Sequence, residues 1–598
     1  MHLTAIDWFS VILFFAVSLG IGVAVSRRAG KSTAEYFAAG RSMPWWLLGI
    51  SMVATTFSTD TPNLVTDLVR TEGVAGNWAW WAFLLTGMLT TFVYAQLWVR
   101  SGVLTDMEFY ELRYSGKSAA FLRGFRALYL GIVFNVLIMA SVTLAAIKIG
   151  GVLLGLGPIT VVLIAGSVTV IYSMMGGLRG VIFTDFIQFI LAMIGAVGAA
   201  YIALSLPEVG GLNNLLTHPN LDGKLSLLPS FTDREALIAL LIIPLAVQWW
   251  SVWYPGAEPG GGGYVAQRML SAKDEDNAIG ATFLFQAAHY ALRPWPWILV
   301  ALASLIVFPD LASLEEAFPH MDPSIVRNDM AYPAMLTFLP AGLLGLVVAS
   351  LIAAYMSTIS THLNWGSSYI VHDFYKRFLR PGASERELVR MGRVSTALLM
   401  VLAGFFALQL QNALDTFQIM LQVGAGTGLI FILRWFWWRI NAASEITAMV
   451  VSFVLAVYFR FGHAAVFGER LPSTTELLLG VGITTACWLV VALVLPPAET
   501  ATLRRFYRLT QPGGPGWRKV VEEAAADGDS LTPVAVAWNV PQGILCMVLG
   551  CASVYGALFG VGYLLYGEML SGIVALVVAV ASGIALSRAW RTLRGRTV

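Results

Sequence analysis

The sequence predicts an all-α integral membrane protein that crosses the bilayer about fifteen times. Of its 598 residues, 57% are hydrophobic and only 12% are charged, whereas soluble domains carry roughly 25% charged residues. Apolar runs of about 20 residues, enough to span ~30 Å of hydrocarbon, recur along the chain. The basic residues gather in alternate loops. Together these features indicate the lipid bilayer, and not nucleic acid, as the partner of this chain.

Fifteen apolar segments are long enough to be transmembrane helices. The first, 6–25, is too long for a signal peptide and is followed by Ser26-Arg27-Arg28. The others are expected at 43–68, 78–99, 127–150, 157–175, 181–204, 236–255, 279–308, 338–372, 391–410, 414–437, 442–461, 474–495, 538–564 and 568–588.

The distribution of basic residues predicts the orientation of the chain in the membrane. With the N-terminus outside, most of the 37 Lys and Arg fall in the cytoplasmic loops and the C-terminal tail. This is the positive-inside pattern, so we expect the N-terminus outside and the C-terminus inside. The predicted location is the plasma membrane, or the cytoplasmic membrane of a bacterium. External segments would carry only Arg70, Lys224, Arg234, Arg327, Arg460 and Arg470.

Two spans contain residues that interrupt a helix. The second breaks within 54–62, where Pro62 cannot donate a backbone hydrogen bond and Asp60 lies among apolar neighbours. The seventh ends in 254–263, which is rich in proline and glycine. Irregular backbone at membrane depth is tolerated where it lines a cavity or is buried in protein. Because the two breaks lie five spans apart, they predict an inverted repeat of spans 2–6 and 7–11 with the binding site between the halves.

The ninth span combines an apolar helix with four hydroxyls, at Ser357, Thr358, Ser360 and Thr361. In membrane helices such hydroxyls often bond back to the carbonyl one turn earlier. Four within five positions instead favour an oxygen-lined site for a hard cation such as sodium. Polar groups inside a membrane span indicate function by default.

The predicted organisation places these features in a transport core at 43–437. The first span and its loop occupy 1–42, and two further spans occupy 438–496. A cytoplasmic linker at 497–535 contains a short amphipathic helix at 517–526, and a final helix pair with a basic tail covers 536–598. The sequence gives no physical account of that pair, and its three cysteines show no metal-binding spacing.

Several local motifs together resemble the sodium:solute symporter family. The resemblance implies a LeuT-type 5+5 inverted repeat with additional flanking helices, and it runs through roughly residues 5–495. The matching stretches, in the family's order, are Tyr172–Gln188, Tyr264–Arg268, Ala354–Thr358, His372–Lys376 and Trp435–Asn441.

The resemblance implies a sodium site between the second and ninth spans. The matching ligands are the carbonyls of Ala54, Phe57 and Ala354 and the hydroxyls of Ser357 and Thr358. About five neutral oxygens suit a monovalent cation, whereas calcium usually recruits carboxylates. In relatives that use a second sodium, the matching residues are Asp185, Ser357, Ser360 and Thr361. The alternative for Asp185 is a capping or loop carboxylate at the cytoplasmic end of its helix.

The resemblance also implies a solute site beside the first break. The matching positions are Thr56, Ser58, Asp60, Thr61, Trp80, Tyr264 and Arg293. Trp80 replaces a polar residue of sugar-carrying relatives, and Arg293 stands where their solute-touching lysine stands. These departures favour a solute that carries a carboxylate, or a zwitterion, over a neutral sugar.

Arg293 has two interpretations. A guanidinium makes bidentate contacts with carboxylates, so it could hold an anionic solute. It could instead form a permanent structural pair with Asp60 or Glu258. The adjacent His289 and Tyr290 are expected to be packing residues rather than proton relays.

The favoured function is a sodium-coupled symporter that imports a small organic solute by alternating access with one or two sodium ions. No nucleophile–base–acid arrangement indicates an enzyme. The alternatives are a sodium/sugar symporter and a non-transporting membrane sensor on the same scaffold. The solute, the sodium stoichiometry and the oligomeric state are not determined by the sequence.

Overall fold

The computed structural model describes residues 3–29, 32–252, 258–529, 531 and 538–595. In this part of the chain every named element is helical, and the only β-type contact is a single bridge between Met43 and Ala272. The all-α prediction is therefore confirmed.

The first predicted repeat follows α1 (Ala5–Ala29) and the short α2 (Thr33–Ala38). Its elements are α3 (Trp45–Thr56), α4 (Asp60–Glu72), η2 (Val74–Asn77), α5 (Trp78–Trp81), α6 (Leu84–Leu89), η3 (Thr90–Tyr94), α7 (Ala95–Ser101), η4 (Asp106–Glu108), α8 (Phe109–Arg113), α9 (Gly116–Leu128), η5 (Tyr129–Phe134), α10 (Asn135–Leu154) and α11 (Pro158–Ser205). Gly177, at φ 53°, divides α11 where spans 5 and 6 are predicted to meet.

The second predicted repeat follows a loop, predicted to be external, with the short α12 (Leu212–Thr217). Its elements are α13 (Arg234–Leu237), η7 (Ile238–Ile242), η8 (Pro244–Gln248), α14 (Trp249–Ser251), α15 (Gly263–Ser271), α16 (Glu275–Ala287), η9 (Ala288–Leu292), α17 (Pro294–Val307), α18 (Leu311–Ala317), α19 (Ala331–Met335), α20 (Leu343–Ser368), η13 (Tyr369–Leu379), α21 (Glu385–Ala407), α22 (Ala413–Gly424) and α23 (Gly428–Leu433).

The remaining helices flank this core. They are α24 (Ala442–Val457), η14 (Tyr458–Gly462), α25 (His463–Phe467), α26 (Ser473–Val494), α27 (Thr500–Thr510), α28 (Arg518–Ala526), α29 (Val540–Leu565) and α30 (Met569–Gly595).

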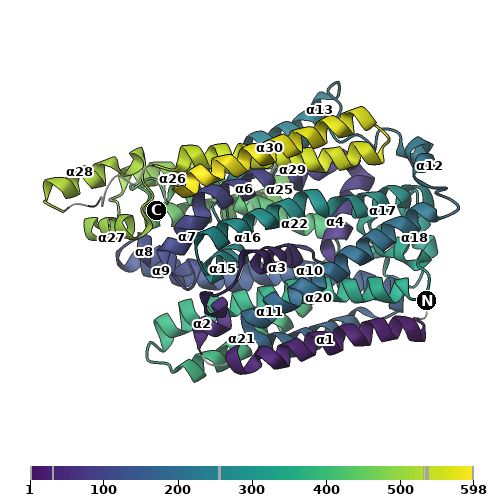
Figure 1. The fold of residues 1–598 in the computed structure, drawn as a ribbon, viewed down its shortest axis with the longest axis horizontal. Coiled ribbons are helices and arrows are strands. Elements are labelled where there is room, and N and C mark those ends of the chain that lie inside the picture. Colours follow the sequence, from purple (N-terminus) through teal and green to yellow (C-terminus); the bar gives the residue numbers. More distant parts are fainter. Residues whose placement is uncertain (1–2, 30–31, 253–257, 530, 532–537, 596–598) are drawn as a thin grey trace.

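The long helices form one membrane-sized bundle. Among the described residues, 11 helical stretches are long and apolar enough to cross a membrane, and three shorter apolar helices accompany them. Figure 1 shows most of the long helices running in roughly one direction, with the N- and C-termini at opposite ends of the bundle. A chain with an odd number of spans must have its termini on opposite sides of the membrane. The count of fifteen spans and the orientation remain predictions.

The predicted break in the second span is real and short. Helix α3 ends at Thr56 and α4 begins at Asp60, so only residues 57–59 leave the helical path. Pro62 lies in the first turn of α4, where its missing N–H is no loss. Asp60 stands at the same N-terminus, where the helix dipole favours a carboxylate. The break is thus encoded by its own sequence.

The seventh predicted span can be compared with the structure only in part, and the ninth differs from its predicted bounds. Of the predicted break at 254–263, residues 254–257 lie outside the described residues, and residues 258–262 are non-helical, with Gly260 and Gly261 at positive φ before α15 begins at Gly263. The ninth span was expected to begin at 338, which is wrong, because Gly342 takes φ 87° and α20 starts only at Leu343. At its other end this helix continues through η13 to Leu379.

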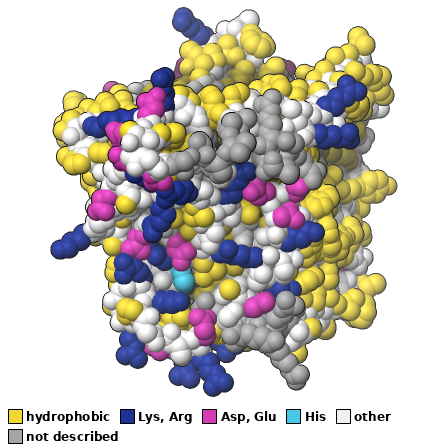
Figure 2. Space-filling view, turned by 60° about the vertical axis from the view of Figure 1, so that its left-hand side comes forward, with side chains coloured by type: hydrophobic (Ala, Val, Ile, Leu, Met, Phe, Trp, Pro, Cys, Tyr) yellow, Lys and Arg dark blue, Asp and Glu magenta, His cyan; other side chains and the backbone are white. Residues whose placement is uncertain are grey.

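The linker contains more helix than predicted. The expected helix at 517–526 is present as α28, and α27 was not anticipated. Helix α27 packs on α7 and α8, buries Leu503 and Phe506, and leaves Arg505 and Arg508 exposed. Figure 2 turns this end of the molecule forward and shows Lys and Arg side chains spread among acidic ones.

Candidate functional site

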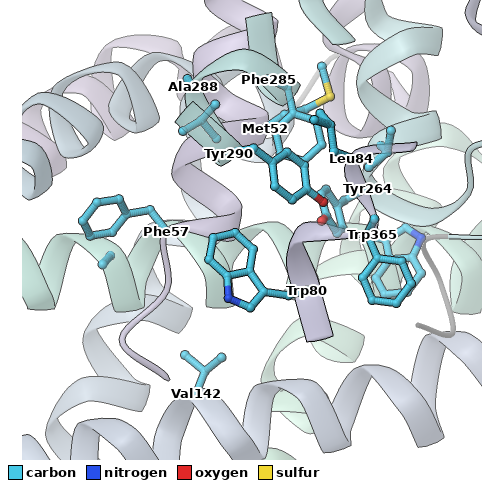
Figure 3. Close-up of a cluster of buried hydrophobic side chains, with 14 of the residues drawn as sticks. Met52, Phe57, Trp80, Leu84, Val142, Tyr264, Phe285, Ala288, Tyr290 and Trp365 are labelled. Carbon is cyan, nitrogen blue, oxygen red and sulfur yellow. The ribbon is translucent and has the colours of Figure 1, made fainter. Parts of the chain in front are cut away.

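The break in the second span lies at the centre of the candidate site. Helices α3, α10, α16, α17 and α20 surround it, so elements of both predicted repeats meet there. Figure 3 shows Phe57, Trp80, Tyr264 and Tyr290 around the end of α3, each contributed by a different element. The geometry divides into a hydroxyl side, which faces α20, and an aromatic side, which faces η9.

On the hydroxyl side, one predicted sodium ligand of α20 contacts the end of α3 directly. Thr358 donates its hydroxyl to the carbonyl of Thr55, 2.7 Å away, and so links α20 to the last turn of α3. Ala54, Phe57, Ala354 and Ser357 are also buried, each 3% exposed or less. Neutral carbonyl and hydroxyl oxygens are the kind of donor that a monovalent hard cation takes, so the chemistry of these residues is compatible with sodium.

Asp185 joins the same cluster from α11. Its carboxylate accepts hydrogen bonds from Ser357 at 2.6 Å and from Ser51 at 2.5 Å. The side chain is fully buried. The alternative of a capping or loop carboxylate is therefore not what the structure contains, since Asp185 reaches the predicted sodium ligand Ser357 directly.

Arg268, on α15, is a member of this cluster that the sequence did not reveal. Its guanidinium lies 3.8 Å from the Asp185 carboxylate and donates to the hydroxyl of Thr361 at 2.7 Å. Thr361 lies in turn 3.0 Å from the hydroxyl of Thr55. Ser360 does not join them, because its hydroxyl donates to the Ser357 carbonyl in its own helix. Among the residues predicted to bind a second sodium, Ser360 is the one whose hydrogen bond stays within its own helix.

On the aromatic side, Thr56 and Arg293 are connected through His289. The Thr56 hydroxyl lies 3.0 Å from His289 Nδ1, and Arg293 Nη2 lies 2.5 Å from the same nitrogen and 3.0 Å from Nε2. His289 belongs to η9, a π-type segment, and such segments are frequent at functional sites. Sequence reasoning treated His289 as packing, yet it bridges two predicted solute-binding residues.

Arg293 is buried without a carboxylate partner. It is 1% exposed, and its guanidinium lies over the ring of Trp297 at 5.3 Å. Among the described residues no carboxylate oxygen lies within 4.0 Å of it, and its Nη1 has no hydrogen-bond partner. Glu258, one proposed structural partner, is paired with Arg126. An isolated guanidinium at membrane depth costs at least ~2.5–3.5 kcal/mol.

Asp60, the other proposed partner of Arg293, points toward different groups. Ser58 donates to one of its carboxylate oxygens, and Ser141 of α10 lies 3.4 Å from the other. Thr61 braces the break by donating to the Thr56 carbonyl at 3.2 Å. Thr56, Asp60 and Thr61 keep partial exposure although they lie inside the bundle. These three residues, predicted to bind the solute, are therefore not completely enclosed by packing.

Trp80 forms the aromatic wall of the same region. Its indole stacks on Tyr290 with ring centres 5.7 Å apart and meets His289 edge-on at 5.5 Å. Its N–H is already used in a hydrogen bond to Asn77 at 2.9 Å. Trp80 thus offers a ring face, and Tyr264 packs farther along the wall beside His362.

Comparisons with known proteins bear on the family and the fold. The model of the "Sodium:solute symporter family" matches residues 36–452. A sodium/glucose cotransporter of Vibrio parahaemolyticus is 27% identical over 480 residues, which cover 77% of this chain and 86% of the relative. A sodium/mannose cotransporter of Bos taurus is 27% identical over 470 residues, covering 74% and 76%.

A solved structure supports the fold. A substrate-bound, outward-open Na+-coupled sialic acid symporter superposes with a TM-score of 0.65 at 22% identity. The alignment covers 83% of this chain and 99% of that one. The predicted arrangement of helices is thereby confirmed at the level of fold.

Proposed function

The chain belongs to the sodium:solute symporter family, and we propose that it imports a small organic solute bearing a carboxylate, alone or with an ammonium group. It is a multi-pass membrane transporter and not an enzyme. Inward sodium flow would drive the uptake, since each charge that crosses gains ~2.3 kcal/mol per 100 mV.

The first sodium is proposed to bind the carbonyls of Ala54, Phe57 and Ala354 and the hydroxyls of Ser357 and Thr358. The bond from Thr358 to the Thr55 carbonyl supports this assignment, because it brings the two ligand-bearing helices within hydrogen-bonding distance. With an ion present, the hydroxyl oxygen would face the cation and its proton would turn away. Binding would then join α3 to α20 more firmly than the hydrogen bond alone.

A second sodium is proposed beside Asp185, with Ser357 and Thr361 as further ligands. The carboxylate would lower the cost of placing a cation in a low-dielectric site. Arg268 competes for the same charge, so a second ion requires the guanidinium to withdraw. The ratio of charge to solute moved in proteoliposomes, for wild type and Asp185→Asn, tests this assignment. Equal ratios would contradict a second sodium at Asp185 and would indicate that this carboxylate pairs with Arg268 only.

The solute class follows from one observation, the buried guanidinium of Arg293 that lacks a carboxylate. A carboxylate of the solute would complete its hydrogen bonds and neutralise its charge. His289, which contacts Arg293, also contacts the Thr56 hydroxyl and the ring of Trp80. Asp60, on the opposite side of the break, is placed to receive an ammonium group. A zwitterion would therefore satisfy both ends of the site.

The test is sodium-dependent uptake into proteoliposomes across a panel of solutes. The panel contains amino acids, D-glucuronate, N-acetylneuraminate, D-glucose, D-mannose and myo-inositol, each measured with sodium or choline outside. Charged hydrogen bonds contribute ~1.5–3 kcal/mol, so Arg293→Gln is expected to weaken affinity for the accepted acid by about 10- to 100-fold. Arg293→Lys keeps the charge and should lose the bidentate geometry. The control is Arg460→Gln, on the exposed surface of η14.

A neutral sugar is the second candidate. The relatives are named for glucose, mannose and myo-inositol, and the stacked pair of Trp80 and Tyr290 supplies an aromatic face. Accumulation of D-glucose with an affinity that Arg293→Gln leaves intact would establish this candidate and overturn the carboxylate assignment. Sodium binding without accumulation of any panel member would instead indicate a sensor.

A further inference from the structure

A large apolar chamber opens beside the site, on the lipid-facing side of the bundle. It has a volume of about 200 Å³ and is lined by α1, α10, α11 and α20. Figure 1 shows α1, α11 and α20 side by side along the lower edge of the bundle, and these three helices pack on one another. We name it the α1–α11 chamber, and its walls include Val11, Phe15, Leu153, Val168, Ile352 and Met356.

The chamber is connected to the membrane at one end. Trp8 on α1 and Ile164 on α11 line it and are 49% and 55% exposed. Their exposed neighbours, such as Phe9 and Leu163, are also apolar, as expected for a surface that lies against lipid. The mouth therefore continues the lipid-facing surface of a multi-pass membrane protein.

The inner end reaches the break in the second span. Thr59, which lies in the break, lines the chamber together with Met356, which precedes the predicted sodium ligand Ser357. Both residues are almost completely buried. An occupant would thus extend from the membrane to the segment that carries the transport site.

The polar atoms along the walls already have partners. Thr59 donates to the Val142 carbonyl at 3.0 Å, and Thr169 donates to the Ala165 carbonyl at 2.7 Å. The Tyr355 hydroxyl lies 3.3 Å from that of Thr143. Water in a cavity needs two to four polar partners, and apolar cavities stay dry. A polar solute or a water cluster therefore finds little to bind here.

The dimensions fit an elongated apolar molecule. The chamber residues of α10, α11 and α20 run from Ala146 to Leu154, Val161 to Thr169 and Val348 to Met356. Each stretch is about 12 Å long at 1.5 Å per residue. One leaflet contributes about half of the ~30 Å hydrocarbon core. Because protein interiors are close-packed, a space of this size beside lipid is expected to be filled.

We propose that the α1–α11 chamber binds one acyl chain of a membrane phospholipid, with the chain end beside Thr59. The chain enters between Trp8 and Ile164 and lies along the helices. The headgroup stays outside, since no charged side chain lines the chamber. The site is separate from the solute and sodium sites and does not depend on which solute is carried.

Photolabelling of the full-length protein tests this proposal. The probe is a phosphatidylcholine with a diazirine near the end of one acyl chain, incorporated into proteoliposomes and mapped by peptide mass spectrometry. Adducts on chamber residues such as the buried Leu153 and the half-buried Val168 and Ile352 are expected. Adducts confined to exposed positions such as Ile12 and Leu163 would overturn the proposal. The same chain on phosphatidylglycerol should label these residues equally, and labelling by only one headgroup would contradict recognition of the chain.

A matched pair of variants provides a second test. Ala165→Phe places a ring inside the chamber, so labelling of Leu153 and Ile352 should be lost. Ala16→Phe places the same ring on the exposed face of α1, outside the chamber walls, and should change nothing. Undiminished labelling in monodisperse Ala165→Phe protein would overturn the proposal. If this variant does not fold, the labelling map of the wild-type protein decides the question alone.

Discussion

At the residue scale, the hydroxyls of α20 perform different tasks although they are close in sequence. Thr358 faces α3 and Ser357 faces Asp185, whereas Ser360 bonds only within its own helix. A side chain that already has a local partner on α20 contributes nothing to a site between helices. Among residues that share one motif, the structure therefore distinguishes hydroxyls that contact other helices from one that bonds within its own helix.

This difference predicts the outcome of a paired mutagenesis experiment. Ser357→Ala with Thr358→Ala removes two of about five proposed sodium ligands, so it should raise the sodium concentration for half-maximal thermal stabilisation at least about tenfold, equal to ~1.4 kcal/mol. Ligand that binds the folded state raises Tm, so a sodium titration of Tm in choline-balanced buffer measures the effect. Ser360→Ala is the matched control and should leave the titration unchanged. A shift of equal size in both variants would mean that the hydroxyls are structural.

The sequence could identify the hydroxyls, the break and the charged residues, but not how they pair. Ser357, Thr358 and Asp185 stand in recognisable motifs, and the structure brings them together. Arg268 lies in the matched Tyr264–Arg268 stretch, but its ion pair with Asp185 could not be predicted from the sequence. That pair depends on how α15 packs against α3 and α20. The sequence predicts His289 to be a packing residue, which is the usual role of a lone histidine in an apolar helix. Its contact with Arg293 is local, four residues along the chain, whereas its contact with Thr56 arises only when η9 meets the end of α3.

At the element scale, the last helix pair acquires a physical account that the sequence did not provide. Helix α29 packs on α6, η3 and η9, elements of the third and eighth spans. Tyr555 donates to the Trp81 carbonyl at 2.8 Å, and Trp295 donates to the Leu558 carbonyl at 2.9 Å. Trp81 follows Trp80, so α29 supports the aromatic wall of the solute site from behind. Small residues let the helices approach closely, as is common in membranes.

The close approach at Gly562 makes α29 sensitive to a single methyl group. A Cβ at this position would lie 2.1 Å from the ring of Trp295, whose hydrogen bond to α29 holds it in place. Gly562→Ala should therefore lower stability by ~1–3 kcal/mol, the usual cost of overpacking. Gly482→Ala, on α26, meets no atom within 4 Å and is the control. Equal Tm values for both variants in the same detergent would show that Trp295 moves aside freely.

Near the predicted cytoplasmic end, Asp106 connects two helices, and its ionisation makes the stability of the protein depend on pH. Asp106 of η4 accepts hydrogen bonds from the Gly263 N–H and the Tyr369 hydroxyl, and so joins α15 to η13. Burial, with the nearby Glu258 carboxylate, raises the pKa of Asp106 to about 7. The folded state therefore holds a proton that the unfolded state has released.

It follows that ionisation of Asp106 opposes folding as the pH rises from its unfolded pKa of 3.8 to about 7. Stability should fall across this window because the native state binds more protons than the unfolded state. Asp106→Asn cannot ionise, so its Tm should decrease less than that of wild type between pH 5 and pH 8, as measured by differential scanning fluorimetry. Parallel pH profiles for the two proteins would show that Asp106 titrates normally.

At the scale of the whole molecule, hydropathy determined more of the architecture than any motif did. Apolar length and the two helix breaks were enough for the helical bundle and the repeat, because a bilayer leaves a spanning chain few alternatives to helix. The chamber between α1 and α11 could not be anticipated, since it depends on how four helices leave space between them. The role of α29 was also hidden, because residues 453–598 lie beyond the family match.

The last prediction concerns orientation, which the charge distribution implies and the fold leaves open. The termini lie at opposite ends of the bundle in Figure 1, and the basic loops predict that the C-terminal end is cytoplasmic. In a background with Cys487, Cys546 and Cys551 replaced by serine, single cysteines would be placed at the exposed positions Ser230 and Lys519. A membrane-impermeant maleimide on intact cells should label Ser230→Cys directly and Lys519→Cys only after permeabilisation. The reverse pattern would place the N-terminus inside, and labelling of both before permeabilisation would require an even number of crossings between them.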